Sequence, residues 1–242
     1  YSDVSNVRWE IWYNGKKLGE KTIQLYREEK KVATSGYLNG HEWVDLGLSV
    51  KWATCNVGAT KPEEYGHYYA WGETSPKSRY DDDNYKHYSD SWYGQLTKYC
   101  DVHYYEGHCD NKVVLDLSDD AAHVNWGRGW RMPTKTEFQE LCLNCTSVKT
   151  KKNGINGRLF TSKKNGQSIF LPAAVLWRGE EIPKYDEYPH PQFCAGFYWS
   201  SSLVSYSEDP ILRNGRAWQL NLAYPEVVTM YRSDGLTVRA VC

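Results

Sequence analysis

The sequence predicts an α+β domain that is rich in loops and is preceded by a β-hairpin. The two clearest helix-start signals lie before residue 145, and the last quarter of the chain holds four short strand-like runs separated by turns. Helices followed by a string of short antiparallel strands are typical of α+β folds. The 20 Tyr and 11 Trp, against 5 Phe and 2 Met, suit half-wet positions, and 19 Gly indicate many turns.

Composition and charge narrow the class of protein. A formal net charge of −1 gives no electrostatic basis for binding nucleic acid or an anionic membrane. No apolar run approaches the roughly 20 residues that a membrane helix needs. The chain begins at Tyr1 instead of Met, and its seven cysteines are an odd number. In an exported protein this number predicts some disulfides and at least one remaining thiol, so we expect export.

The first element expected is a hairpin over residues 7–26. Apolar and polar residues alternate in its first half, and Asn14-Gly15 is a strong turn pair. An isolated hairpin is marginally stable in water, so it is either docked on the rest of the protein or the end of a preceding domain. With the charge-rich linker that follows, it makes up residues 1–39, and the main domain is expected over 40–242.

The main domain opens with a strand signal, the alternation of Val44, Leu46 and Leu48. Residues 63–92 then form a long segment of Tyr, Asp, Ser and Gly without sustained periodicity. Such a segment is either a functional loop or a solvated surface excursion, and the pattern does not decide between them.

Two helices follow from capping signals. Ser118 is expected to cap a short helix over 119–126, whose first turn is acidic. Thr134 and Glu137 form a capping box, which predicts a helix from Lys135 to about Asn144. Four residues at helical spacing share one face that should be buried: Phe138, Leu141, Cys142 and Cys145.

Strand-like runs complete the domain. A second hairpin is expected over 156–175, with its turn at 163–166. Four further strands are expected at 196–202, 216–222, 226–233 and 236–242.

The cysteines suggest either chemistry or cross-linking. Cys142-x-x-Cys145 has the spacing of a redox pair or half of a zinc site. Both cysteines lie on the apolar helix face, however, where cysteine acts as a small hydrophobe, and a zinc site needs four compatibly spaced ligands. We therefore expect no metal there. Cys100 with Cys109, and Cys145 with Cys242, are candidate disulfides, although pairing cannot be deduced from sequence.

Other candidate sites are weaker. The acidic runs 81–84 and 116–123 offer oxygen ligands for calcium, but neither matches an EF-hand loop, and the second is explained as a helix start. The serines at 200–202 lack a Gly-x-Ser-x-Gly elbow. The sequence also has no Gly-rich phosphate loop and no basic stripe. We expect no catalytic constellation and no cofactor, with calcium the one alternative left open.

Six motifs occur in an order that resembles a known family. They are "WVDLGLSVKWATCNVGA", "EEYGHYYAWGET", "DDAAHVNWGRGWRMPTKTEFQEL", "NGQSIFLPAA", "YWSSS" and "VRAVC". From about Gly40 to Cys242 the chain resembles the Fibrobacter succinogenes major paralogous domain, a family abundant in exported proteins and lipoproteins of Bacteroides-type gut bacteria. Members look like C-type-lectin-fold domains, related to formylglycine-generating enzymes and to the variable proteins of diversity-generating retroelements.

The resemblance implies a C-type-lectin-like fold in which Trp126, Trp130, Thr134 and Glu137 are scaffold. It implies a cell-surface or extracellular protein, with any lipid anchor lying N-terminal to this chain. It also places ligand recognition in loops near the C-terminus, and loops on a rigid scaffold are where recognition usually occurs. The binding residues expected there combine aromatic and polar side chains: Tyr206, Trp218, Gln219, Asn221, Tyr224, Tyr231, Arg232 and Asp234.

The leading hypothesis is a non-catalytic binding or adhesion domain that recognises a protein or a glycan. Formylglycine-generating enzymes use a C-terminal cysteine pair within a characteristic segment, whereas here only Cys194 and Cys242 lie in the last quarter, in different surroundings. A cysteine- or metal-dependent enzyme of that type is therefore an alternative. A structural component of a surface assembly, with the hairpin as a joint, is the other.

Overall fold

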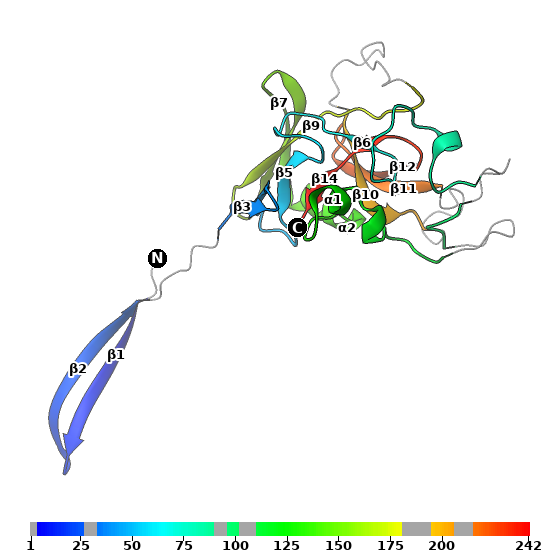
Figure 1. Ribbon diagram of the computed structural model, residues 1–242. Helices are drawn as coiled ribbons and strands as arrows, with labels where there is room; N and C mark the ends of the chain where they lie inside the picture. Colours follow the sequence, from blue (N-terminus) through cyan, green and yellow to red (C-terminus); the bar gives the residue numbers. More distant parts are fainter. Residues whose placement is uncertain (1–3, 27–32, 90–95, 102–109, 181–194, 206–214) are drawn as a thin grey trace. The chain divides into compact units, whose positions relative to one another are not determined.

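The computed structural model describes residues 4–26, 33–89, 96–101, 110–180, 195–205 and 215–242 of the chain (Figure 1). The chain forms two compact units, Tyr1–Ala33 and Thr34–Cys242. The boundary lies earlier than the predicted one at residue 40. The reason is that the end of the expected linker is strand β3 (Ser35–Leu38), which pairs within the second unit.

The first unit is the predicted hairpin. Strand β1 (Val4–Tyr13) pairs antiparallel with β2 (Lys16–Tyr26). The turn residues Asn14 and Gly15 have φ angles of 47° and 76°. Both angles are positive, as a two-residue type I′ turn requires, and this turn matches the natural twist of paired strands. The prediction of the hairpin and its turn is confirmed.

The second unit consists mainly of antiparallel sheet with two short helices in its described part, which confirms the α+β class. Its strands form three sheets, and the pairing of β10 with β13 is parallel. The five-stranded sheet has the order β12 (Glu226–Tyr231), β11 (Arg216–Asn221), β10 (Phe197–Leu203), β13 (Leu236–Thr237) and β6 (Tyr68–Tyr69). The four-stranded sheet has the order β14 (Arg239–Val241), β5 (Trp52–Asn56), β4 (His41–Val44) and β3. The three-stranded sheet contains β7 (Cys145–Lys152), β8 (Ile155–Ser162) and β9 (Ser168–Pro172).

Strands from the two ends of the second unit lie side by side. The last strand, β14, lies beside β5 (Figure 1) and pairs with it, and the register places Arg239 opposite Asn56. The Arg239 guanidinium donates to the Asn56 side-chain oxygen at 2.8 Å and to the carbonyl oxygen of Ala53 at 3.0 Å. The end of the chain is thereby fixed to the first strands of the unit.

Helix α2 (Lys135–Asn144) begins and ends where the sequence predicts. The Thr134 hydroxyl accepts from the backbone N–H of Glu137 at 3.3 Å, and the Glu137 carboxylate accepts from the N–H of Thr134 at 2.7 Å. The capping box is therefore confirmed, and it satisfies two backbone N–H groups at the helix start.

Helix α1 (Ala121–Trp126) starts two residues later than predicted. Asp120 is its N-cap and accepts from the backbone N–H of His123 at 2.9 Å. Ser118, the predicted cap, lies instead in a short 3-10 helix, η2 (Leu117–Asp119). Two residues near the start are competent caps, and Asp120 is the one whose carboxylate also accepts from the N–H of Met132 at 2.8 Å.

The five-stranded sheet lies between two hydrophobic clusters, because side chains alternate between its faces. On one face Trp199, Ala217 and Leu236 pack with Ala121, Ala122 and Trp126 of α1 and with Trp130, and Trp126 and Trp130 are both buried as predicted. On the other face Tyr198, Leu220 and Leu222 pack with Phe138 and Leu141 of α2.

The long segment after β5 is only partly a surface loop. Tyr68, Tyr80 and Tyr85 are buried and form a third cluster with Ala70 and Ala174. A 3-10 helix, η1 (Asp82–Asn84), follows Tyr80 and Asp81. In the described part of this segment, four tyrosines are buried in the core, namely Tyr68, Tyr69, Tyr80 and Tyr85, so the interpretation as a fully solvated excursion is wrong.

Candidate functional site

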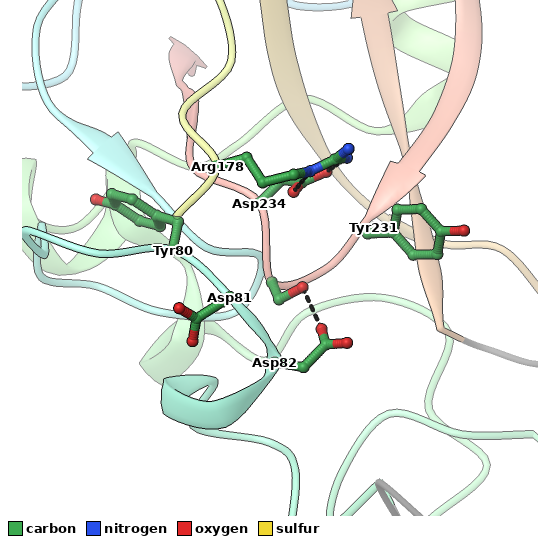
Figure 2. Close-up of a pocket in the computed structure, with 7 residues that line it drawn as sticks. Tyr80, Asp81, Asp82, Arg178, Tyr231 and Asp234 are labelled. Atoms are coloured by element: carbon green, nitrogen blue, oxygen red, sulfur yellow. Dashed lines mark hydrogen bonds and ion pairs between the residues drawn. The ribbon is translucent and has the colours of Figure 1, made fainter. Parts of the chain in front are cut away.

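The candidate site is a pocket of about 260 Å³ beside the turn that follows β12 (Figure 2). Three segments that are distant in sequence form its walls: the start of η1, the stretch after β9, and residues 231–234. The lining residues are Tyr80, Asp81, Asp82, Arg178, Tyr231, Ser233 and Asp234.

Backbone bridges hold these segments together. Trp177 and Gly235 exchange two N–H to O=C hydrogen bonds, both of 2.8 Å. Tyr80 and Gly179 exchange two more, of 2.9 and 2.7 Å. Gly235 lies directly against the ring of Tyr80, where an added Cβ would lie 2.8 Å from ring atoms. The close approach therefore requires glycine, and it gives the pocket walls a fixed backbone.

An ion pair and an aromatic ring line the pocket (Figure 2). Arg178 donates from Nε and Nη2 to the two carboxylate oxygens of Asp234, at 2.7 and 2.6 Å. This two-point geometry fixes the plane of both groups. The Asp234 side chain is buried, whereas that of Arg178 is 53% exposed. Tyr231 is 47% exposed, and the guanidinium of Arg216 lies 4.1 Å from its ring centroid. The ring is thus held in place while part of it remains accessible.

The opposite wall is acidic. Asp81 forms an ion pair with Arg79, and Asp82 accepts a hydrogen bond from the Ser233 hydroxyl at 2.5 Å. Burial raises the pKa of Tyr80 to about 12, so its phenol stays protonated at neutral pH and acts as a structural donor.

The chemistry of this lining suits binding better than catalysis. Among the described residues, the pocket lining contains no thiol, imidazole or amine. Asp81 and Asp234 are each paired with a guanidinium, and Asp82 is hydrogen-bonded to a hydroxyl. What remains is an exposed aromatic ring next to oriented polar groups in a concave surface, which can position a ligand by hydrogen bonds and ring contacts.

Two of the predicted binding residues, Tyr231 and Asp234, lie in this pocket. Trp218 is half-buried and lines a different pocket of about 250 Å³, where the Lys135 ammonium lies 3.6 Å from its ring centroid. Tyr206 lies outside the described residues.

Two more predicted binding residues lie at the turn between β11 and β12. Tyr224 is 61% exposed there. Asn221 is half-buried, and its side-chain oxygen accepts from the N–H of Ala223 at 2.9 Å, which stabilises the turn. The structure therefore places the predicted binding residues at several locations and not on one surface.

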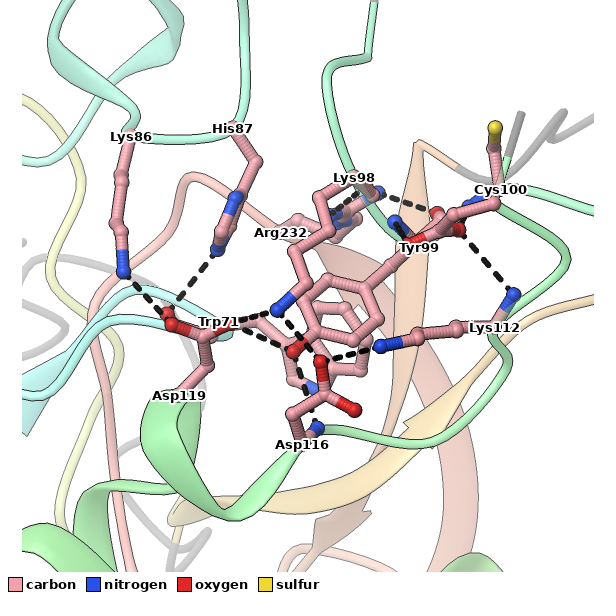
Figure 3. A network of polar contacts seen from close by, with 12 residues as sticks. Trp71, Lys86, His87, Lys98, Tyr99, Cys100, Lys112, Asp116, Asp119 and Arg232 are labelled. Atoms are coloured by element: carbon pink, nitrogen blue, oxygen red, sulfur yellow. Dashed lines mark hydrogen bonds and ion pairs between the residues drawn. The ribbon is translucent and has the colours of Figure 1, made fainter. Parts of the chain in front are cut away.

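The prediction of Gln219 and Arg232 as surface contacts is wrong, because both are fully buried. Gln219 lies on β11 between Trp199 of β10 and Val228 of β12. Arg232 points inward, as Figure 3 shows. Its guanidinium donates to the carbonyl oxygens of Tyr99 and Lys98, both at 3.0 Å, and to the Tyr85 hydroxyl at 2.9 Å.

The acidic run at 116–123 is neutralised by lysines and helix N–H groups (Figure 3). Lys86 and Lys98 lie 2.7 and 2.5 Å from the two oxygens of Asp119, and Lys98 and Lys112 each lie 2.7 Å from Asp116. Burial alone would raise the pKa of Asp119, but these contacts hold it well below its ordinary range. Across the described residues, no group of three or more His, Cys, Asp or Glu side chains is placed to hold a metal ion. The calcium alternative therefore gains no support from this region.

The structure rules out one of the two predicted disulfides and does not test the other. Cys145 and Cys242 are free thiols, so the predicted link between them is wrong. Cys145 packs in the cluster around α2, whereas Cys242 packs against the cluster around α1. Cys100 is disulfide-bonded, and its predicted partner Cys109 lies outside the described residues. Burial raises the pKa of Cys142 and of Cys145 to about 11, so neither is a nucleophilic thiolate at neutral pH.

One further pocket contains a thiol. It has a volume of about 330 Å³, lies beside β4 and β5, and is lined by Cys55, His41 and Trp126 among others. The His41 ring stacks on Trp126 with centroids 3.9 Å apart, and burial lowers the pKa of His41. The polar neighbour of the Cys55 sulfur is the Thr54 hydroxyl at 3.7 Å. This arrangement lacks the hydrogen bond from nucleophile to base that thiol catalysis uses.

Sequence reasoning missed most of the lining of the candidate site. Asp81 and Asp82 belong to the run considered for calcium, but nothing in the sequence connects them with Tyr231. Arg178 stands after the second hairpin without a periodic signal. The contacts that bring these residues together are backbone bridges between segments more than fifty residues apart, which side-chain patterns do not encode.

Within the described ranges, every helix is too short or too polar to traverse a bilayer. The chain matches no known protein-family model, and it matches neither a curated protein nor a solved structure.

Proposed function

We propose that this protein is a non-catalytic binding domain that recognises a protein or a glycan through the pocket beside the β12–β13 turn. One observation carries the proposal: the exposed ring of Tyr231 stands next to the two-point Arg178–Asp234 pair, on walls joined by backbone bridges. A rigid site loses little conformational entropy on binding, so its contacts contribute more fully to affinity.

The lining suits both ligand classes. Tyrosine presents an amphipathic surface with few rotatable bonds, which is why it is common in adaptable recognition sites. Ser233, beside Asp234, adds a hydroxyl, and Asp82 adds a carboxylate on the opposite wall. A sugar ring and a peptide side chain both require this combination of an apolar contact and oriented polar partners.

Within the α+β class we propose a C-type-lectin-like fold. The motifs that carry the family resemblance support this proposal, because they form the frame of the second unit. "WGRGWRMPTKTEF" supplies buried Trp126 and Trp130 and the capping box of α2. "VRAVC" contains β14, which pairs with β5 in the motif "WVDLGLSVKWATCNVGA".

Export to the cell surface or the extracellular space is part of the proposal. The disulfide at Cys100 supports it, since disulfides persist in oxidising compartments. The elevated pKa values of Cys142 and Cys145 favour binding over the cysteine-dependent enzyme.

The test is a binding screen of the full chain on an oligosaccharide array and a peptide array, followed by titration of the strongest ligand. Tyr231→Ala should raise the dissociation constant about tenfold or more, because it removes the accessible ring of the pocket.

Tyr224→Ala is the matched control. Tyr224 is at least as exposed as Tyr231 and lies outside the pocket, so its removal should change affinity by less than about twofold. Binding in neither array, or equal losses in the two variants, would contradict the proposal.

A further inference from the structure

The hairpin of the first unit has two chemically different faces. The register places Trp9 opposite Lys21 and Glu10 opposite Glu20, and successive side chains of a strand point to opposite faces. One face, called the apolar face below, is formed by Val7, Trp9, Ile11 and Tyr13 of β1 and by Ile23, Lys16 and Lys21 of β2 or its start.

The other face is occupied by its own polar contacts. Lys17 lies 2.7 Å from Glu10 and also pairs with Glu20, which in turn pairs with Arg8. Trp12 belongs to this face, because its indole N–H donates to Glu10 at 3.1 Å. The charged groups of this face therefore have partners within the hairpin.

No other described part of the hairpin covers the apolar face. Trp9, Ile11 and Tyr13 are 63%, 64% and 67% exposed. Together with Val7 and Ile23 they present on the order of 500 Å² of apolar surface, as much as the largest patch on a typical whole monomer. A patch of this size marks an interaction site more often than a tolerated surface.

Both edges of the hairpin are also open. Its sheet contains only β1 and β2, so each of these long strands presents a row of backbone N–H and C=O groups that no third strand within the described residues pairs with. Such an edge is a template for adding a strand. A lipid surface would cover the apolar face but would leave these backbone groups without partners, which is costly in an apolar environment.

The charges on the hairpin distinguish the two remaining candidates for binding the apolar face, which are a second copy of this chain and a strand of another protein. Both carboxylates in the described part of the hairpin, Glu10 and Glu20, lie on the opposite face. The only charged side chains on the apolar face in the described part of the hairpin are the cations Lys16 and Lys21. A second copy packed face to face would bring lysine towards lysine, whereas an apolar strand flanked by carboxylates would complement both the patch and its charge.

We propose that the apolar face and an open edge of the hairpin bind an extended strand of a protein partner, in which alternating apolar residues are flanked by carboxylates. This interaction is independent of the pocket in the second unit, and it gives the hairpin the role of an attachment point by strand addition.

The experiment titrates the full chain with two synthetic peptides, Asp-Val-Thr-Val-Thr-Val-Asp and its counterpart with lysine at both ends. The acidic peptide should bind about tenfold or more tightly than the basic one. Trp9→Ala should weaken its binding about tenfold or more, and Trp12→Ala, an equally exposed tryptophan on the opposite face, should change it less than about twofold. The double variant Lys16→Glu with Lys21→Glu should reverse the preference between the peptides.

Four outcomes would overturn the proposal. Equal binding of the two peptides, or no binding of either at millimolar concentration, would show that the apolar face does not bind an acidic strand. Trp9-dependent dimers in sedimentation velocity would assign the face to a second copy. Trp9-dependent binding to phosphatidylglycerol vesicles, with no binding of the acidic peptide, would assign it to a lipid surface. Shielding of Trp9 from acrylamide in the unbound chain, judged against Trp9→Phe, would show that the face is already covered.

Discussion

Arg232 shows how a charged side chain is stabilised inside the second unit. Its guanidinium donates to two backbone carbonyls and one hydroxyl, and it lies 4.8 Å from the ring centroid of Trp71. Arginine suits such a site because it has several planar donors and stacks on aromatic rings. In the sequence the residue stands at the end of the expected strand 226–233, and its place among the predicted binding residues implies exposure. Its acceptors lie more than 130 residues away in the chain, so no local pattern indicates its burial.

Replacing Arg232 tests this role. Arg232→Met should lower the free energy of unfolding by about 3 kcal/mol, because it leaves buried carbonyl groups without donors. Arg178→Met should lower it less than Arg232→Met does, because Arg178 is half exposed and solvent screens its ion pair, although its buried partner Asp234 loses two donors. Urea unfolding of the two variants measures the difference, and equal losses would contradict the structural role of Arg232.

His87 predicts a dependence of stability on pH. Burial lowers its pKa in the folded state to about 4, from an ordinary value of 6.5. The unfolded chain therefore binds the proton first as the pH falls, so the stabilisation is complete above about pH 6.5 and is lost as the pH approaches 4. The free energy of unfolding should fall by about 2 kcal/mol between pH 7 and 4.5. His87→Phe should remove most of this slope in urea titrations. An unchanged slope in that variant would show that other groups cause it.

At the scale of elements, the sequence predicts features that involve nearby residues, such as helix caps, but not which strands pair with each other. The capping box of α2 involves residues three apart, and its helix was predicted with the right bounds. The start of α1 was misplaced, because both Ser118 and Asp120 are acceptable caps and tertiary contacts select Asp120. The expected strand over 236–242 divides into β13 and β14, which belong to different sheets. The alternation of apolar and polar residues along a strand does not show which sheet the strand joins.

The capping box supplies the prediction at this scale. Thr134→Ala should lower the free energy of unfolding by about 1 kcal/mol, because the N–H of Glu137 loses its acceptor. Thr136→Ala, in the same turn, keeps both capping-box bonds and should cost less than about 0.5 kcal/mol. Thermal unfolding of the pair measures the difference, and a larger loss in Thr136→Ala would refute the capping role of Thr134.

At the scale of the whole molecule, the candidate site depends on contacts between distant segments. Tyr231 and Asp234 were predicted from residue type near the C-terminus, and the structure places both in one pocket. Arg178 and Asp82 join them through the backbone bridges at Gly235 and Gly179 and through their side-chain bonds to Asp234 and Ser233. The hairpin pattern and the charge-rich linker predict a first unit that ends at residue 39, whereas the first unit in the structure ends at Ala33, because β3 pairs with β4.

The most direct test of the account is amide hydrogen exchange of the full chain, with and without the strongest ligand from the arrays. We expect slower exchange confined to residues 80–82, 177–179 and 231–235, which form and support the pocket. The turn at 222–225 should serve as an internal reference with unchanged exchange, since it lies outside the lining. Protection centred instead on the pocket of His41 and Cys55, with none at 231–235, would contradict the proposed site.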